Sequence, residues 1–212
     1  MAEYLDLEGW PRRAAFDYFR RFDKPYFNVC VRLDVAPLKA ALPAGGFAAA
    51  CWYATLKLAN GIEPFRYRLD QGRVRILPAV HGATTVLRAD DSFSFAYLDW
   101  AGEGFAAFRA HADARVRAAR DGADFEPRVD DGALVHYTTL PWVHFTSFSH
   151  ARNWGREDSV PKIAFGRLLA DGPQLWMPFS LEVHHALMDG LHVGRFVQAF
   201  EAMLADPSWV RT

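Results

Sequence analysis

Apolar and polar residues alternate along several stretches of the chain, which is the period expected of half-buried β-strands. The clearest case is residues 27–35, where every second side chain is apolar. Strands are predicted at Tyr4–Leu7, Phe27–Val35, Phe65–Leu69, Val74–Leu77, Val80–Leu87, Phe93–Leu98, Leu134–Leu140, Lys162–Ala170 and Gln174–His185, with an extended piece at Val143–Phe148. Turn residues at 70–72 and 171–173 predict two hairpins.

Between these strands, apolar residues recur at helical spacing. In Gly102–Arg120 the apolar stripe includes Phe105, Phe108 and Ala112. Helices are predicted from Pro11 to about Arg21, as one turn at Pro37–Leu42, at Phe47–Asn60, at Gly102–Arg120 and from about Asp189 to Leu204. The chain has no internal repeat and no Ser/Pro-rich linker, so residues 1–212 are predicted to form one domain of the α/β or α+β class with a mostly mixed sheet.

Composition places the chain among globular proteins. Of 212 residues, 51% are apolar and 23% charged, which argues against disorder. The 25 acidic and 24 basic residues leave a net charge of −1, which argues against nucleic acid or an anionic membrane as the main partner. The aromatic share of 15% exceeds what a core alone needs and suggests a pocket or a subunit interface.

Cysteine usage and the N-terminal segment bear on the cellular compartment. Cys30 and Cys51 occur without a CxxC motif, so two reduced core thiols are expected, with one disulfide as the alternative. The N-terminal segment lacks the apolar region of a secretory signal, and no stretch reaches about 18 apolar residues. We therefore expect a cytoplasmic protein that does not enter the membrane.

The segment from Val183 to Gly190 carries the densest chemistry. In an extended strand His184 and His185 point to opposite faces, so they cannot hold one metal ion, and no metal site is predicted. His185 ends an apolar strand face, and Asp189 fits as the N-cap of the last helix. A neutral imidazole there can act as a general base. A core histidine bonded to the backbone explains the same spacing equally well.

The run HHALMDGLHVGRF resembles the active-site signature of the chloramphenicol acetyltransferases. Further resemblances to this family lie in GWPRRAAFDYF, FNVCVRLDVAPLKAAL, TTLPWVHFTSF and PKIAFGRLLADGPQLWMPFSLEVHH. Together these segments cover almost the whole chain, in the family's order and at similar spacing. The resemblance implies an α+β-like two-layer sandwich in which helices pack on a large mixed β-sheet.

The resemblance also implies the catalytic roles. His185 matches the general base, which takes a proton from the acceptor hydroxyl as its oxygen attacks the acetyl-CoA thioester directly, in a ternary complex. Asp189 matches a structural carboxylate that pairs with an arginine, here Arg12. Thr138 matches the serine whose hydroxyl binds the developing oxyanion. Ala164 stands where the family has a threonine that holds a water near this oxygen.

The predicted binding sites also differ from the family pattern. For the acceptor, Phe19 replaces a family tyrosine beside Tyr18, and Phe93 falls in the region of an apolar pocket wall. For coenzyme A, Arg167 matches a basic residue near the phosphates, whereas Gly46 replaces a family lysine. Affinity for coenzyme A is therefore expected to rely on different cations.

The implied partners are acetyl-CoA as co-substrate, a small hydroxyl acceptor and two further copies of the chain. The family is a homotrimer with its active sites at subunit interfaces, and its role is antibiotic resistance. The changed pocket residues leave open an acyltransferase for a different alcohol or with a longer acyl donor. Ala164 and the threonine at position 138 leave open a noncatalytic ligand-binding protein with the same fold. A purely structural trimer is a third alternative, and intact His185 and Asp189 argue against the last two.

Overall fold

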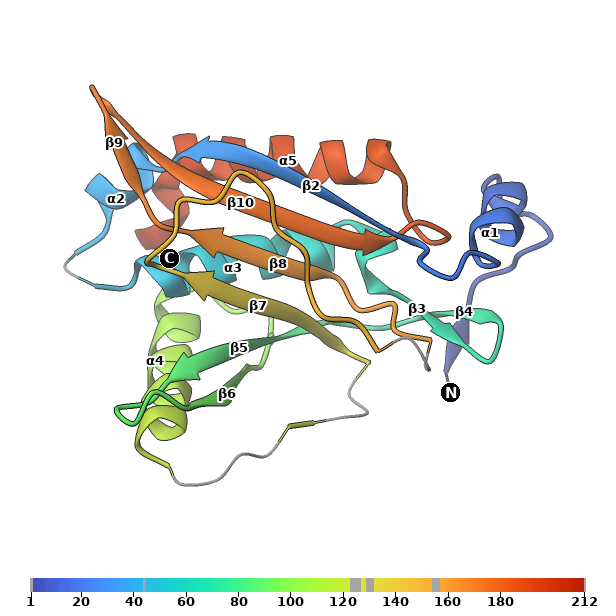
Figure 1. The fold of residues 1–212 in the computed structure, drawn as a ribbon, viewed down its shortest axis with the longest axis horizontal. Coiled ribbons are helices and arrows are strands. Elements are labelled where there is room, and N and C mark those ends of the chain that lie inside the picture. The colour runs from blue at the N-terminus through green and yellow to red at the C-terminus, as the bar shows by residue number, and fades with distance from the viewer. Residues whose placement is uncertain (1, 44, 123–126, 129–131, 154–156, 212) are drawn as a thin grey trace.

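In the computed structural model, seven strands form one mixed sheet (Figure 1). The structure describes residues 2–43, 45–122, 127–128, 132–153 and 157–211. The sheet order is β2-β10-β8-β7-β5-β6, with β9 paired to β10; β8, β7 and β5 run parallel to one another. These strands are β2 (Tyr26–Asp34), β5 (His81–Leu87), β6 (Phe93–Leu98), β7 (Leu134–Leu140), β8 (Lys162–Gly166), β9 (Leu169–Asp171) and β10 (Gln174–His184).

One face of this sheet is covered by helices (Figure 1). Because side chains alternate along a strand, Tyr137, Phe165 and Leu181 point into the core formed with these helices. Helix α3 is apolar on most of its sides because it lies between the sheet and two other helices. The helices are α2 (Ala36–Ala41), α3 (Phe47–Gly61), α4 (Phe105–Asp121) and α5 (Gly190–Ala205).

A smaller three-stranded sheet, β1-β4-β3, lies at the end of the molecule that carries α1 (Figure 1). Strands β3 and β4 join through Gln71 and Gly72, both with positive φ, as in a tight hairpin turn. Phe16 of α1 shares a second apolar cluster with Ala186 and Leu187, which follow β10. The elements are β1 (Glu3–Tyr4), α1 (Arg13–Phe19), β3 (Tyr67–Asp70) and β4 (Arg73–Ile76).

The predicted fold class is confirmed, while several element boundaries differ. Residues 63–66 form a short 3-10 helix rather than the start of a strand, because Pro64 fixes a helical φ. Residues 5–7 and 143–148 belong to no strand. The strand predicted at Lys162–Ala170 divides into β8 and β9, because the N–H of Arg167 donates to Val143 O at 2.8 Å. Cys30 and Cys51 are both free thiols.

The opposite face of the sheet carries a buried cluster of charges. Arg152 donates to Glu182 at 2.7 Å and to Asp158 at 3.1 Å, and its side chain is only 2% exposed. Lys162 lies 3.2 Å from the second oxygen of Asp158. These bonds fasten the connection between β7 and β8, which crosses this face (Figure 1). Buried ion pairs of this kind fix geometry more than they add stability.

Three histidines lie around this charge cluster. Burial, with a smaller contribution from nearby cations, lowers the pKa of His136, His150 and His184 from 6.5 to about 4. The folded chain therefore keeps these three imidazoles neutral at a pH where the unfolded chain protonates them.

We predict that folded stability falls as the pH is lowered from 6.5 toward 4, because the unfolded chain then binds more protons than the folded chain. Each histidine contributes a slope of roughly 1.4 kcal/mol per pH unit at its steepest. Urea unfolding between pH 7.5 and pH 5 measures this slope. His136→Gln should reduce the slope of the unfolding free energy against pH by the contribution of about one proton. An unchanged slope would contradict the prediction.

Candidate functional site

The loop between β10 and α5 holds the predicted catalytic motif. His184 ends β10 with a buried side chain, and His185 follows it in the turn. Ala186, Leu187 and Met188 are completely buried and anchor the loop. Asp189 then caps α5, because its carboxylate accepts the N–H of Leu191 at 3.0 Å.

Arg12 joins this loop to the N-terminal segment. Its Nε donates to Asp189 Oδ2 at 3.0 Å, and its remaining nitrogens donate to three backbone carbonyls. The carbonyl distances are 2.7 Å to Leu187, 3.2 Å to Ala186 and 3.3 Å to His185. Since the Arg12 side chain is 15% exposed, these charge-assisted bonds form largely out of water. One guanidinium therefore fixes the whole backbone turn that carries His185.

His192 is a third partner of Asp189, and the sequence analysis gave it no role. Its Nδ1 lies 2.9 Å from Asp189 Oδ1 and accepts the Asp189 backbone N–H at 3.2 Å, which completes a capping box. Burial lowers the pKa of His192 against the pull of Asp189. Burial acts to raise the pKa of Asp189, but the charges around it hold that pKa below its usual value. Of the influences that lower it, the charge of His192 is the largest, followed by the hydrogen bond from Arg12 and the charge of Arg12.

The imidazole of His185 is held between aromatic rings. The Phe19 ring stacks on it with 3.7 Å between centroids and 8° between planes, and the Phe27 ring lies 4.7 Å away. The His185 backbone N–H donates to Pro25 O at 2.7 Å. Nδ1 is buried and has no hydrogen-bond partner among the described residues. The neighbours of this ring therefore fix its plane by packing, without a hydrogen bond at Nδ1.

Two of the predicted acceptor-pocket residues lie on this side of the molecule. Phe19 packs directly on His185, as described above, and therefore supports the imidazole. Tyr18 points outward, with 61% of its surface exposed, and its ring meets Phe19 edge-on at 5.1 Å. The change from tyrosine to phenylalanine thus alters the immediate neighbour of the predicted base.

Thr138 and Ala164 lie directly opposite each other on β7 and β8. Thr138 follows the core residue Tyr137, so its side chain lies on the sheet face away from the helices. Strand alternation places Phe93 on the same face, at the exposed start of β6. The structure therefore places the position predicted for the oxyanion donor beside the position where the family threonine is missing.

His185 and Thr138 of one chain do not meet. Ala164 pairs with Thr138 on one side and with Ser180 of β10 on the other, so two strand spacings separate Thr138 from β10. His185 lies five residues further along the chain than Ser180. With strands about 4.8 Å apart and a rise of about 3.3 Å per residue, the separation is roughly 19 Å. Figure 1 shows the end of β7 and the loop after β10 at opposite ends of the sheet.

An apolar cavity of about 350 Å³ opens where β7 and β8 end. Its walls include Phe47 and Ala48 of α3, Thr139 after Thr138, and Arg167 after β8. Arg167 is exposed, so its charge is available to a ligand at the cavity mouth. An apolar wall beside an exposed cation suits a ligand with a hydrophobic part and an anionic part.

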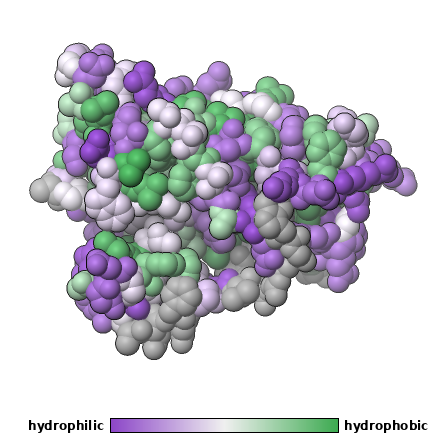
Figure 2. All heavy atoms as spheres, viewed as in Figure 1, coloured by the Kyte–Doolittle hydropathy of each residue, from purple (hydrophilic) through white to green (hydrophobic). Residues whose placement is uncertain are grey.

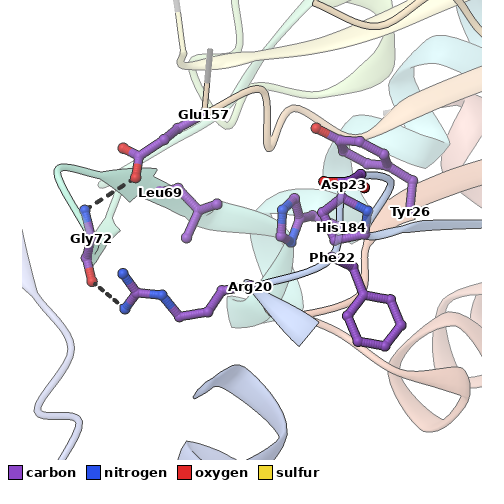
Figure 3. A pocket seen from close by; sticks show the side chains of 9 residues that line it. Arg20, Phe22, Asp23, Tyr26, Leu69, Gly72, Glu157 and His184 are labelled. Carbon is purple, nitrogen blue, oxygen red and sulfur yellow. Dashed lines mark hydrogen bonds between the residues drawn. The ribbon is translucent and has the colours of Figure 1, made fainter. Parts of the chain in front are cut away.

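A second cavity, of about 180 Å³, lies on the His184 side of the motif (Figure 3). Figure 3 shows Arg20, which donates to Gly72 O at 3.1 Å, and Glu157, which accepts the N–H groups of Gln71 and Gly72. Neither His185 nor Phe19 lines this cavity, but Phe22 does, and its ring lies 5.4 Å from that of Phe19.

Two further observations concern metals and membranes. Within the described part of the chain, no three His, Cys, Asp or Glu side chains gather closely enough to hold a metal ion. None of the described helices has both the length and the apolar character needed to cross a bilayer.

Comparison with known proteins gives concordant matches. The family model described as Chloramphenicol acetyltransferase matches residues 2–201. The chloramphenicol acetyltransferase of Streptomyces acrimycini is 32% identical over 97% of this chain and 96% of its own length, and that of Campylobacter coli is 24% identical over 94% and 97%.

Solved structures show the same fold. A chloramphenicol acetyltransferase structure aligns with a TM-score of 0.86 and 24% identity, covering 96% of this chain and all of the other. The cubic core of the pyruvate dehydrogenase multienzyme complex aligns with a TM-score of 0.66 and 19% identity, covering 89% and 84%.

We predict that Arg12→Ala lowers the free energy of unfolding by about 2–3 kcal/mol, because it leaves Asp189 and three carbonyls without their donor. Arg12→Lys should not recover this stability, since one ammonium cannot reach the Asp189 carboxylate and the three carbonyls together. Arg13→Ala is the matched control: its exposed pair with Asp17 at 3.5 Å should contribute about 0.5 kcal/mol or less. Urea denaturation at pH 7 measures all three, and equal losses in both alanine variants would refute the prediction.

Proposed function

Because the chain belongs to the chloramphenicol acetyltransferase family, a family of acetyltransferase enzymes, we propose that it is an acetyl-CoA-dependent O-acetyltransferase. The acceptor is a hydroxyl of chloramphenicol or of a similar small molecule. The observation that carries this proposal is the setting of His185, whose imidazole is clamped by Phe19 on a backbone turn that Arg12 fixes.

In the proposed reaction His185 acts as the general base. It takes the proton of the acceptor hydroxyl while that oxygen attacks the thioester carbonyl carbon of acetyl-CoA. The hydroxyl of Thr138 donates a hydrogen bond to the oxyanion that forms. When the tetrahedral intermediate collapses, the carbon–sulfur bond breaks and the proton passes from His185 to the sulfur of coenzyme A. Acetyl transfer is direct, so no acetyl-enzyme forms.

Each proposed active site needs two copies of the chain. The separation of roughly 19 Å estimated above from strand geometry keeps His185 and Thr138 apart within one chain. Large apolar side chains remain exposed where β7 and β8 end, at Leu87, Phe93, Trp142, Val143 and Leu169. Figure 2 shows hydrophobic residues on this face, mainly in that half of the molecule. We propose a homotrimer in which His185 of one subunit faces Thr138 of the next, since an exposed apolar surface favours association.

The identity of the acceptor depends on the aromatic residues. Phe19 offers no phenol donor beside the base, and this observation favours a second candidate, an alcohol other than chloramphenicol. Ala164, opposite Thr138, cannot hold a water by a hydroxyl, which is the basis for the third reading, a ligand-binding protein without turnover. With chloramphenicol as the acceptor, the role of the protein is antibiotic resistance in the cytoplasm.

We predict that His185→Ala lowers the turnover number by at least about 10²–10⁴-fold, because a positioned base is lost. Release of coenzyme A thiol from acetyl-CoA is followed with chloramphenicol and with a panel of other small alcohols. His111→Ala, on α4, is the control and should keep wild-type activity. Acceptor binding by the wild type with no thiol release from any alcohol would instead support the noncatalytic reading.

A second prediction tests the shared site. Thr138→Val should lower turnover by about 10²–10³-fold, through loss of one oxyanion donor, whereas Thr138→Ser should retain activity. Co-expression of His185→Ala and Thr138→Val chains should then restore activity in mixed trimers, where about one interface in three carries both wild-type side chains. If each site lies within one chain, the mixed oligomers stay inactive.

A further inference from the structure

The peptide group before His185 is hydrogen-bonded at both ends. Its N–H, which belongs to His185, donates to Pro25 O at 2.7 Å. Its carbonyl, which belongs to His184, accepts the N–H groups of Leu187 and Met188 at 3.0 and 3.1 Å. All the partners in these bonds are backbone groups. They fix one of the two peptide planes that meet at the Cα atom of His185.

The peptide group after His185 is held by two side chains instead. Its carbonyl accepts a hydrogen bond from Arg12 Nη2 at 3.3 Å, and its N–H, which belongs to Ala186, donates to Nδ1 of His184 at 3.2 Å. Ala186 is completely buried, and a buried N–H without an acceptor is costly. The two peptide planes at His185 determine the direction of its Cβ atom. The His184 imidazole therefore takes part in setting where the His185 side chain points.

The surroundings of His184 keep its imidazole able to accept this hydrogen bond. The side chain is buried, and burial, followed by the charge of Arg152, lowers its pKa from 6.5 to about 4. At neutral pH the ring is uncharged, and acceptance at Nδ1 places its single proton on Nε2. The Tyr26 ring packs edge-on against the imidazole, with 5.1 Å between the centroids, and both residues line the cavity shown in Figure 3.

We propose that His184 is a positioning residue for His185: its neutral imidazole accepts the Ala186 N–H and thereby fixes the direction in which the His185 imidazole leaves the turn. This inference rests on the proposed function of His185 as the general base, and it makes kcat depend on a histidine that takes no part in the proton transfer. The stack of Phe19 on His185, with 3.7 Å between centroids, leaves little room for displacement. A displacement of about 1 Å in a catalytic group costs up to about 100-fold in rate.

Two variants separate the roles of the two ring nitrogens of His184. In His184→Asn the side-chain oxygen takes the place of Nδ1 and accepts the N–H two residues further on, as in an Asx turn. In His184→Gln the amide takes the place of Nε2, so the Ala186 N–H loses its acceptor. We expect His184→Gln to lower kcat about 10–100-fold. The KM values for acetyl-CoA and for the acceptor should change by less than about twofold, and His184→Asn should keep kcat within about threefold of wild type.

A spectroscopic measurement tests the position of His185 without turnover. Because the Phe19 ring stacks on the His185 imidazole, it shields the protons of that imidazole in the NMR spectrum of protein with isotope-labelled histidine. This shielding should be retained in His184→Asn and reduced in His184→Gln, and His185→Ala identifies the signals. In the wild type at pH 7, the ring nitrogen shifts of His184 should show the proton on Nε2. A proton on Nδ1 would overturn the inference whichever variants fold, because that nitrogen could not accept.

The matched control is Tyr26→Phe, which removes the hydrogen bond from the Tyr26 hydroxyl to Asp158 O at 2.7 Å and keeps the ring beside His184. It should retain the wild-type kcat and His185 shielding, even with a lower free energy of unfolding. Wild-type kcat and shielding in His184→Gln would overturn the inference. Equal losses in His184→Asn and His184→Gln, or an equal loss in Tyr26→Phe, would also overturn it, because the acceptor atom would then not matter. If the wild type acetylates none of the alcohols, the proposed function fails, and the NMR comparison still decides this inference.

Discussion

The guanidinium of Arg12 joins two parts of the chain that are 177 residues apart, and the geometry of the candidate site depends on this contact. Five donors in a rigid plane can serve one carboxylate and several carbonyls at the same time, which no other side chain can do. The turn after β10 leaves its carbonyls without helical or strand partners, and Arg12 supplies them. The histidine that follows the strand is thereby held at one position.

That anchored turn explains how an aromatic stack can orient the imidazole. His185 has no hydrogen-bonded partner at Nδ1 among the described residues, so its ring plane is set by packing against Phe19 and Phe27. Packing orients the ring without occupying Nδ1, which suits the proposed role of His185 as a general base. Asp189, in contrast, is engaged by Arg12 and by the N–H of Leu191 at the start of α5.

The two faces of the large sheet carry different kinds of side chain. The face covered by helices carries the apolar core, and the opposite face carries the buried ion cluster around Arg152 and, further along, Thr138. Ser180 of β10 lies level with Thr138, and His185 follows five residues later, so the proposed base and the proposed oxyanion donor lie at opposite ends of the sheet. In the proposed homotrimer, one chain supplies the base of a site and its neighbour supplies the oxyanion donor.

The sequence by itself determined the elements and the chemistry they carry. Alternation and turn residues located most strands, a cap identified Asp189 as the start of the last helix, and the motif pointed to His185. The predicted element boundaries were wrong where a residue contacts a segment distant in sequence. Arg167 is an example, because its N–H donates to Val143 O and the predicted strand stops there. Pattern alone cannot foresee such a contact, because it depends on a segment distant in sequence.

Only the tertiary structure decided which residues meet. It stacked Phe19 on the His185 imidazole, brought His192 within hydrogen-bond distance of Asp189, and packed Arg109 against Gly46. It also separated His185 from Thr138. The physical reason is that side-chain identity and local period act over a few residues, whereas strand order and helix packing fix distances between residues far apart in the chain.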